Sequence, residues 1–386
     1  MPVLFLIVFI DILGFGLLLP LLPFYVQRIG AGPEVITAVL GLYSLAQVIA
    51  APFWGRLSDR YGRKPILVTT CVGLGLSYLV LAFADSLALV VLSRIVGGLM
   101  AGNIAAAQAY IADVTSPETR AKGMGILGAA FGLGLIFGPS IGGLFAGVSV
   151  EGADYRAPAL AAMTLSFIAA AGAAFLLKES LSPEARSHME KRATVGDKLR
   201  VALGRQTLLV LVVTGFLIIT AWAQFETVFA LWVHEMFAFG PREIGFVFGF
   251  MGAVNVLVQG ALMGTLTRRF GEKQLALVGG ILFISGYLAV AVSASLPTLI
   301  LSCAVLAFAS ALFNPSVTSL VSKEAASGER GAVMGAYQSA TALGRVVGPS
   351  VSGALFAAAI TLPYLVAAVL AAGGLALIAF ARKRPE

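Results

Sequence analysis

Four ionisable residues lie inside long apolar runs of the sequence, where a charge is costly. Asp11, Arg94, Glu226 and Arg345 each stand several residues from the nearest polar stretch. An ionisable group at membrane depth costs at least about 2.5 kcal/mol on the insertion scale and usually marks function. In general, burial raises the pKa of a carboxyl group, and a neighbouring arginine or an arriving cation lowers it. A carboxyl group in such surroundings is therefore able to exchange protons in step with ligand binding.

Two interpretations of these residues stay open. Their charges sum to zero, so the four are able to form structural ion pairs in a shared cavity. Alternatively, Asp11 and Glu226 exchange protons. In that case Arg94 tunes Asp11, while Arg345 offsets Glu226 or holds an anionic group of a substrate.

Uncharged polar and aromatic residues accompany these charges on the same runs. They line a substrate cavity in one interpretation, and they form hydrogen bonds or packing contacts between helices in the other. An acid among aromatic rings also suits a lipophilic cation, through charge pairing and cation–π attraction, whereas Trp232 suits an anchor at the membrane interface. Besides the four charges, the candidate cavity residues are Asn103, Gln108, Trp222, Gln224, Phe225, Asn255, Gln259 and Asn314.

The composition indicates that transmembrane helices position these residues. Of the 386 residues, 59% are hydrophobic and only 12% are charged, whereas about a quarter are charged in soluble domains. Runs of about 20 apolar residues cross about 30 Å of hydrocarbon as a helix, which predicts an all-α membrane protein with twelve transmembrane helices. The predicted spans are residues 3–26, 35–54, 66–84, 87–111, 123–147, 157–177, 207–233, 243–266, 274–294, 297–321, 331–356 and 362–381.

Basic residues fall mainly on one side of this predicted topology. Lysine and arginine are enriched in cytoplasmic loops of membrane proteins, so the pattern predicts that both termini are cytoplasmic. The same asymmetry explains the net charge of +7 without nucleic acid as a partner. The predicted cytoplasmic segments hold 21 of the 26 Lys and Arg residues, and they are 55–65, 112–122, 178–206, 267–273, 322–330 and the C-terminal tail.

Three segments of the first half recur in the second half. GRLSDRYGRK (55–64) aligns with GTLTRRFGEK (264–273) at an offset of 209 residues. RAKGMG (120–125) aligns with RGAVMG (330–335), and GPSIGGLFA (138–146) with GPSVSGALF (348–356), both at an offset of 210. Parallel repeats are typical of transporters whose substrate binds between the repeats. The prediction is two pseudo-symmetric six-helix bundles, residues 1–178 and 206–386, joined by a cytoplasmic linker at 179–205.

Two motifs in these repeats resemble a known family. The segment 55–64 resembles the signature between helices 2 and 3 of the major facilitator superfamily. LGFGLLLPLLP (13–23) and Arg94 resemble elements of its drug:proton antiporter branch, which includes tetracycline exporters. The resemblance covers essentially the whole chain and implies the major facilitator fold. The glycine pattern GxxxGPxxGG of the superfamily's antiporters is matched in the fifth predicted helix by Gly134, Gly138, Pro139, Gly142 and Gly143.

The resemblance implies that the charged segment 55–65 is a conformational gate. Taken alone, its basic charges would indicate only that the segment lies on the cytoplasmic side. Asp59 would face the start of the eleventh helix near residues 329–331, where an acid is stabilised by about 0.3–1 kcal/mol. Arg63 would pair with Asp113 and so close the cytoplasmic side in the outward-facing state. The implied gate residues are Gly55, Asp59, Arg60, Gly62, Arg63, Lys64, Asp113 and Arg120.

Other classes of protein fit the sequence poorly. GPSIG (138–142) matches the G-x-S-x-G pattern of serine hydrolases, but it lies in a predicted membrane helix with no histidine nearby. Cys71 and Cys303 have no metal-ligand spacing and are expected to pack inside helices. Neither a metal nor a cofactor is expected. A non-transporting receptor or scaffold would not require an intact gating segment.

The sequence therefore predicts a proton-coupled antiporter that exports amphipathic organic compounds by alternating access. The alternative is a proton-coupled transporter or flippase of an anionic metabolite or lipid. The expected partners are an organic small molecule, protons and the bilayer, for a monomer in a bacterial inner membrane. Unlike tetracycline exporters, the predicted ninth helix has no acid beyond Glu272 and the eighth has no histidine. Tetracycline is therefore not the expected substrate, and Glu226 is expected to take the second acidic role.

Overall fold

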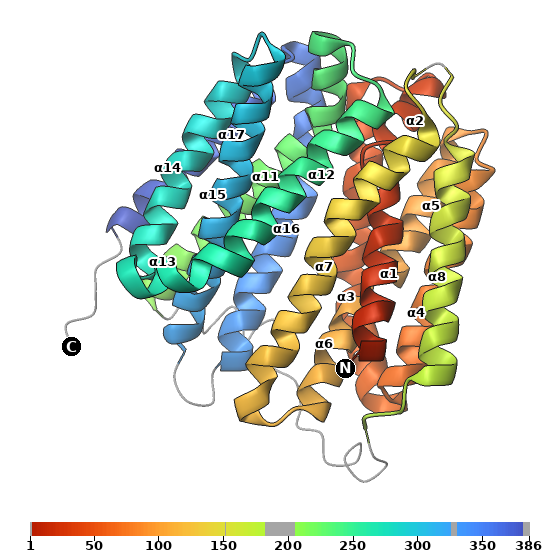
Figure 1. Cartoon of the computed structure of the whole chain (residues 1–386), viewed down its shortest axis with the longest axis vertical. Helices are drawn as coiled ribbons and strands as arrows, with labels where there is room; N and C mark the ends of the chain where they lie inside the picture. Colours follow the sequence, from red (N-terminus) through yellow and green to blue (C-terminus); the bar gives the residue numbers. More distant parts are fainter. Residues whose placement is uncertain (1, 151, 182–204, 326–329, 381–386) are drawn as a thin grey trace. The chain divides into compact units, whose positions relative to one another are not determined.

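The computed structural model describes residues 2–150, 152–181, 205–325 and 330–380, and every regular element in these ranges is a helix (Figure 1). Side chains are described throughout except at 117, 118, 120–122, 330–332 and 380. The prediction of an all-α chain is confirmed. The helices are α1 (Pro2–Leu18), α2 (Leu22–Arg28), α3 (Pro33–Tyr61), α4 (Arg63–Ala82), α5 (Leu87–Met100), α6 (Asn103–Val114), α7 (Pro117–Ala146), α8 (Arg156–Leu176), α11 (Gln206–Phe237), α12 (Pro241–Leu257), α13 (Met263–Phe270), α14 (Glu272–Ala291), α15 (Leu296–Lys323), α16 (Arg330–Ala358) and α17 (Leu362–Phe380).

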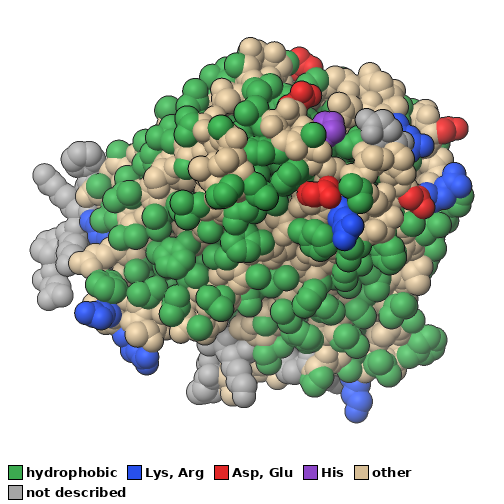
Figure 2. All heavy atoms as spheres, turned by 45° about the horizontal axis from the view of Figure 1, so that its top comes forward, with side chains coloured by type: hydrophobic (Ala, Val, Ile, Leu, Met, Phe, Trp, Pro, Cys, Tyr) green, Lys and Arg blue, Asp and Glu red, His purple; other side chains and the backbone are tan. Residues whose placement is uncertain are grey.

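Each predicted span coincides with one helix or with a broken helix. Ten helices within the described ranges are long and apolar enough to cross a membrane, and the bent pair α1–α2 makes an eleventh span. The remaining predicted span is α16, which is long enough at 29 residues but is more polar, with Arg345 near its middle. Figure 2 shows the matching surface, where hydrophobic side chains cover most of one face and the charged ones lie mainly toward its margins.

The chain divides into two compact units. Unit 1 consists of residues 1–190 with 233–252, and unit 2 consists of residues 191–232 with 253–386. The end of α11 and most of α12 therefore belong with the N-terminal helices. Of the predicted linker 179–205, only 179–181 and 205 lie in the described ranges.

Small side chains allow the helices of unit 1 to pack closely. α1 lies beside α7 and α8, and α4 packs on α8 and α5 (Figure 1). The core at the junction of α1, α4, α6 and α8 contains Leu4, Leu67, Cys71, Ala107 and Ala173, each at most 1% exposed. Cys71 is a free buried thiol, as is Cys303 in unit 2, which confirms the prediction that both pack inside helices.

Aromatic rings fill the core of unit 2, in which α14 packs on α15 and α17. Phe225 of α11 lies 6.1 Å from the ring of Tyr287 and 6.2 Å from that of Tyr364. Trp232 is fully buried and lies 5.3 Å from Tyr364. The prediction of Trp232 as an interface anchor is therefore wrong, because its indole packs inside the unit.

Three of the predicted spans are not regular α-helices. The first is broken at residues 19–21, beside Pro20 and Pro23, and bends by 40°. The fourth is broken at residues 101–102, so that α6 begins at Asn103. The eighth contains a π-helical turn at Val258–Leu262. Such π-helical turns occur frequently at functional sites.

Candidate functional site

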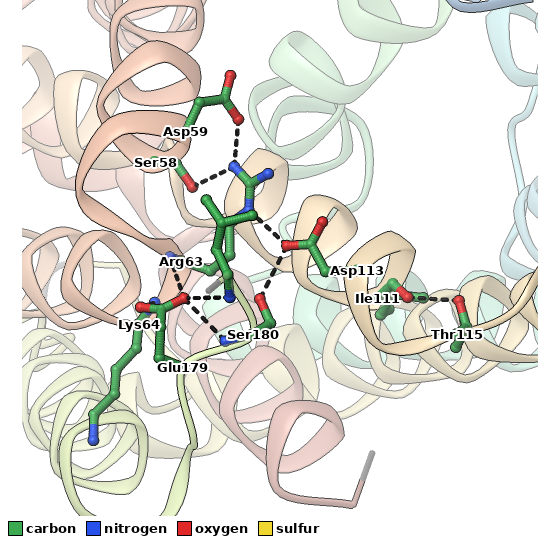
Figure 3. A network of polar contacts seen from close by, with 10 residues as sticks. Ser58, Asp59, Arg63, Lys64, Ile111, Asp113, Thr115, Glu179 and Ser180 are labelled. Atoms are coloured by element: carbon green, nitrogen blue, oxygen red, sulfur yellow. Dashed lines mark hydrogen bonds and ion pairs between the residues drawn. The ribbon is translucent and has the colours of Figure 1, made fainter. Parts of the chain in front are cut away.

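Arg63 is the centre of a polar network at the junction of α3 and α4 (Figure 3). Its side chain is only 2% exposed. Its Nε donates to Asp113 Oδ2 at 2.9 Å, and its Nη1 donates to Asp59 Oδ1 at 2.5 Å and to Ser58 Oγ at 3.1 Å. The implied pairing of Arg63 with Asp113 is confirmed. Because a buried guanidinium requires nearby acceptors, these contacts fix the ends of α3, α4 and α6 relative to one another.

The charged segment 55–65 is helical rather than a loop, which corrects the connection predicted there. α3 continues to Tyr61, Gly62 alone interrupts the helix, and α4 begins at Arg63. Gly62 has φ +107° and ψ 165°, a conformation essentially restricted to glycine. The two glycines of the motif thus have separate roles, since Gly55 is buried inside α3. Arg60, two residues before Gly62, lies over the ring of Tyr61 at 5.3 Å.

Glu179, which follows α8, completes the network and was not among the sequence candidates. Its Oε1 accepts the backbone N–H of Arg63 at 2.9 Å, and its Oε2 accepts that of Lys64 at 3.2 Å. These are the first two N–H groups of α4, which lack partners within the helix. Ser180 Oγ donates to Asp113 Oδ2 at 3.0 Å. The acid that caps α4 thus comes from 116 positions along the chain, a relation that no local sequence pattern signals.

Two implied gate contacts fall outside the described part of the chain. The side chain of Arg120 is not described, and neither are residues 326–329 nor the side chains of 330–332. The implied contact of Asp59 with the start of the eleventh helix therefore stays a prediction. Within the described residues, Asp59 accepts the hydrogen bond from Arg63.

Unit 2 repeats this junction with reversed charges. Gly271 interrupts the helix between α13 and α14 with φ +75° and ψ 159°, close to the conformation of Gly62. The next residue, Glu272, forms an ion pair with Lys323 at the end of α15 and accepts a hydrogen bond from Ser319 at 3.2 Å. Positions 272 and 323 correspond to 63 and 113 at the repeat offsets of 209 and 210. The internal repeat is therefore structural as well as sequential.

Asp11 lies in the interior of unit 1, where α1 meets the start of α6. It is 6% exposed, and its Oδ2 accepts a hydrogen bond from Asn103 Nδ2 at 2.5 Å. Its other carboxylate oxygen, Oδ1, is buried and has no hydrogen-bond partner among the described residues. An unsatisfied buried oxygen costs about 1–3 kcal/mol, more if charged. The arrangement therefore favours a further partner for Oδ1, such as a proton or a ligand.

Arg94 of α5 is also buried, at 3% exposed, and faces aromatic rings rather than an acid. Its guanidinium lies 5.8 Å from the ring centre of Tyr43 and 5.9 Å from that of Tyr78. Its Nη2 has no hydrogen-bond partner, and no ion pair of Arg94 occurs within the described residues. A direct ion pair of Arg94 with Asp11 is therefore not formed. Asp11 and Arg94 both lie close enough to Tyr43 for their charges to act on its hydroxyl group.

Glu226 in unit 2 is close enough to Arg345 of α16 for their charges to interact, without an ion pair in the described residues. The charge of Glu226 also acts on the hydroxyl group of Tyr287, which is fully buried and has no hydrogen-bond partner within the described ranges. Neighbouring Phe225 is fully buried against Phe229, with ring centres 4.8 Å apart. Phe225 therefore packs in the core, whereas half-buried Trp222 stays a cavity candidate.

Besides Asn103, which contacts Asp11, the predicted uncharged polar residues fall into two groups. Gln224 is fully buried and donates to the Pro363 carbonyl at 2.7 Å, which ties α11 to α17. Gln108 of α6 is half-buried. The other three come together through Ser310 of α15, since Gln259 donates to Asn255 at 2.5 Å, Asn255 donates to Ser310 at 3.3 Å, and Asn314 donates to Ser310 at 3.0 Å.

The glycine motif of α7 lets this helix contact α1 and α12 at short range. A Cβ placed on Gly138 would lie 2.7 Å from Gly16 Cα, and one on Gly134 would lie 2.7 Å from Ile12 Cγ2. A Cβ on Gly142 would overlap the Leu17 carbonyl, and one on Gly143 would lie 2.6 Å from the Pro241 carbonyl. The predicted close packing of this glycine face is confirmed, and α7 continues through Pro139 as a helix.

The same packing recurs in unit 2, where α16 meets α11. A Cβ on Gly348 would lie 2.9 Å from Ala223 Cβ, and one on Gly344 would lie 3.0 Å from the backbone nitrogen of Thr220. Repeated helices, ion-paired helix junctions and charged side chains buried in apolar helices together define a multi-pass membrane transporter. The chain belongs to the Major Facilitator Superfamily, whose family model matches residues 4–265 and 256–386.

Curated relatives cover nearly the whole chain. Multidrug resistance protein 2 of Bacillus subtilis is 32% identical, over 96% of this chain and 92% of that protein. Tetracycline resistance protein, class C, of Escherichia coli is 31% identical, over 90% of this chain and 87% of that protein. Because its relatives are transporters, the chain is identified as a transporter and not as an enzyme.

Solved structures share the fold. The crystal structure of the human organic anion transporter MFSD10 (TETRAN) matches with a TM-score of 0.75 and 26% identity, over 98% of both chains. The crystal structure of the nucleoside transporter NupG matches with a TM-score of 0.78 and 15% identity, over 97% of this chain and 96% of that chain, and supports the fold alone. The predicted major facilitator fold is thus confirmed.

Proposed function

We propose that this transporter is a proton-coupled antiporter that exports amphipathic organic compounds by alternating access. The observation that carries the proposal is the environment of Asp11, which is 6% exposed and has one carboxylate oxygen without a hydrogen-bond partner in the part of the chain that the structure describes. A proton on that oxygen removes the charge from an apolar interior, and release of the proton restores it. Asp11 is therefore the proposed proton-coupling residue, with Glu226 as a second one in unit 2.

The substrate class is proposed from the relatives and from the sites. Multidrug and tetracycline resistance proteins are about 30% identical to this chain, which supports an organic compound as the substrate. In unit 2, Glu226 beside half-buried Trp222 supplies a charge and an aromatic surface for a lipophilic cation. The polar group of Asn255, Gln259 and Asn314 supplies uncharged hydrogen-bonding partners.

The gate and the seal are proposed to work from opposite ends of unit 1. The Arg63 network holds the ends of α3, α4 and α6 together, and its opening and closing would accompany the transport cycle. At the glycine motif, α7 packs on α1 and on the segment of α12 that belongs to unit 1. Close packing there excludes water and limits proton leak, which an antiporter requires.

The energy source and setting complete the proposal. The proton gradient drives transport without a cofactor, and the chain works as a monomer. We place it in a bacterial inner membrane with both termini in the cytoplasm, in agreement with the basic residues of the predicted cytoplasmic segments.

A second candidate is proton-coupled transport of an organic anion, as a metabolite or a lipid. Arg94 favours it, because this buried cation has an Nη2 without a partner and no ion pair among the described residues. A carboxylate or phosphate group of a substrate would accept a hydrogen bond from Nη2 and form an ion pair with the guanidinium of Arg94. The relative named as an organic anion transporter supports the same candidate.

Uptake into proteoliposomes under an imposed pH gradient distinguishes the two candidates. Purified protein is tested with a panel of lipophilic cations and organic anions, with and without a protonophore. Accumulation of cations against their gradient, abolished by the protonophore, supports cation export. The same result with anions supports the second candidate. Accumulation that is insensitive to the protonophore contradicts proton coupling for either class.

A further inference from the structure

Helix α6 connects the proposed proton site to the gate within unit 1. Its first residue, Asn103, donates to Asp11, and Asp113 near its other end accepts from Arg63. Ten residue steps separate these two positions, which is about 15 Å along an α-helix. Both ends of one short helix are thus hydrogen-bonded to residues with proposed roles in transport.

A break at residues 101–102 separates α6 from α5 and gives it a pivot. Trp54 of α3 occupies the break, because its Nε1 donates to the Leu99 carbonyl at 2.5 Å. A Cβ on Gly102 would overlap the indole of Trp54. The interruption is the point at which a tilt of α6 would leave α5 in place.

The hydrogen bond from Asn103 to Asp11 depends on the charge of the carboxylate. Hydrogen bonds to an ionised acceptor are about twice as strong as neutral ones. The amide is oriented by a second bond, because Asn103 Oδ1 accepts the backbone N–H of Ile104 at 2.8 Å. Protonation of Asp11 therefore weakens the attachment of the start of α6 to α1.

Few other titratable groups face Asp11. Tyr43 of α3 and Cys71 and Tyr78 of α4 lie within range of its charge, and Arg94 of α5 acts on both tyrosines. The remaining helices beside α1 are α7 and α8, whose charged residues lie only in the first two turns of each helix. Among the described residues, Asp11 is thus the one carboxyl group at this end of α6.

We propose that α6 is a rod that transmits the protonation state of Asp11 to the Arg63 network by pivoting at Gly102. The inference rests on the proposed proton coupling at Asp11. Asn103 is then a positioning residue at the first end of the rod, and Asp113 is its contact at the gate. Loss of the bond between Asn103 and Asp11 lets α6 tilt, which moves Asp113 relative to Arg63 and Ser180.

A distance measurement at the gate end of α6 tests the rod. Spin labels are placed at Val114→Cys, the last residue of α6, and at Lys178→Cys, two residues after α8, since both native side chains are exposed. The native thiols, Cys71 and Cys303, are fully buried and need no replacement for labelling. In proteoliposomes, we expect the distance between the labels to differ between low and high pH.

Three sets of substitutions test whether α6 itself carries the signal. Asp11→Asn is expected to fix the distance at its low-pH value. Asn103→Ala is expected to remove the pH dependence although Asp11 is present, whereas Asn103→Ser, which keeps a donor, is expected to restore part of it. Ala105→Gly with Ala109→Gly softens α6 and is expected to reduce the response at the gate. Asn314→Ala in unit 2 is the control and is expected to leave the distance change intact.

The outcomes distinguish this inference from the proposed function. One outcome is that Asp11→Asn abolishes proton-driven transport, while the label distance changes neither with pH nor in Asn103→Ala. In that case the rod is wrong, and proton coupling at Asp11 stands. If Asp11→Asn leaves proton-driven transport unchanged, the proposed function and the rod are both wrong. A distance change that survives Asn103→Ala at wild-type size also overturns the rod.

Discussion

Arg63 and Glu272 occupy the same position in the two repeats and carry opposite charges. Each follows a glycine of positive φ and begins a helix, and each forms an ion pair with the end of another helix, Arg63 with Asp113 and Glu272 with Lys323. An acid is favourable at a helix N-terminus and a base at a C-terminus. The pair in unit 2 therefore agrees with the helix dipoles, whereas the pair in unit 1 opposes them.

Glu179 explains how the pair in unit 1 is tolerated. It supplies the acid at the N-terminus of α4 that Glu272 itself supplies at the N-terminus of α14. Unit 1 thus depends on a segment after α8 to hold the junction, in addition to Asp59 and Asp113.

The two ion pairs are expected to differ in their contribution to stability. Asp113→Asn leaves the Arg63 side chain, which is 2% exposed, with one charged partner fewer, and we expect a loss of about 3 kcal/mol in the free energy of unfolding. Lys323 is 61% exposed, so Lys323→Gln is expected to lose less than about 1 kcal/mol. Unfolding of the purified protein in mixed micelles measures both. Equal losses would show that the two junctions are equivalent.

Alanine substitutions at two α7 glycines compare a closely packed position with an open one. Gly138→Ala places a methyl group 2.7 Å from Gly16 Cα, so we expect α7 to move away from α1 and transport to fall at least tenfold. Gly125→Ala, on the same helix, places its methyl group more than 4 Å from every described neighbour. It is expected to leave transport unchanged and to stabilise the helix by about 0.5–1 kcal/mol. Initial rates in proteoliposomes measure both, and a transport defect in Gly125→Ala would contradict the role assigned to close packing.

Gly62 and Gly271 provide a matched pair of backbone substitutions. Both have positive φ and an extended ψ, so alanine is expected to cost about 1–3 kcal/mol at either position. Only Gly62→Ala is expected to reduce transport beyond its loss of stability, because Arg63 follows it. The comparison uses the transport rate per folded protein, with unfolding followed separately. Equal transport defects in the two variants would argue against a special role of the junction in unit 1.

Sequence patterns predicted the helices and the repeat well, because apolar length and charge bias depend on local composition. They also placed Asp11, Arg94 and Asn103 in one unit. They missed Glu179 and the role of Trp54 at the helix break, since both depend on segments distant in the chain. They assigned Phe225 to a cavity and Trp232 to an interface, because an apolar run does not reveal which face of a helix packs inside the protein.

Arg94 is expected to set the preference for substrate charge. Arg94→Gln removes a buried cation that lies 5.8 Å from the ring centre of Tyr43 and 5.9 Å from that of Tyr78. If an organic anion is the substrate, we expect Arg94→Gln to raise its half-saturating concentration at least tenfold. Tyr43→Phe keeps the aromatic ring and is expected to change the half-saturating concentration by less than threefold. Uptake of the best anion from the panel measures both variants. An unchanged affinity in Arg94→Gln would remove Arg94 from substrate binding.

Proton movement triggered by substrate tests the central claim most directly. Proteoliposomes with an internal pH indicator receive the transported compound, and the wild-type protein is compared with Asp11→Asn and, as the control, with Asp85→Asn, which changes an exposed acid between α4 and α5. We predict that substrate drives protons in the opposite direction in the wild type and in the control, and that Asp11→Asn transports substrate only downhill without proton movement. Proton movement of wild-type size in Asp11→Asn would contradict the assignment of Asp11 as the coupling residue.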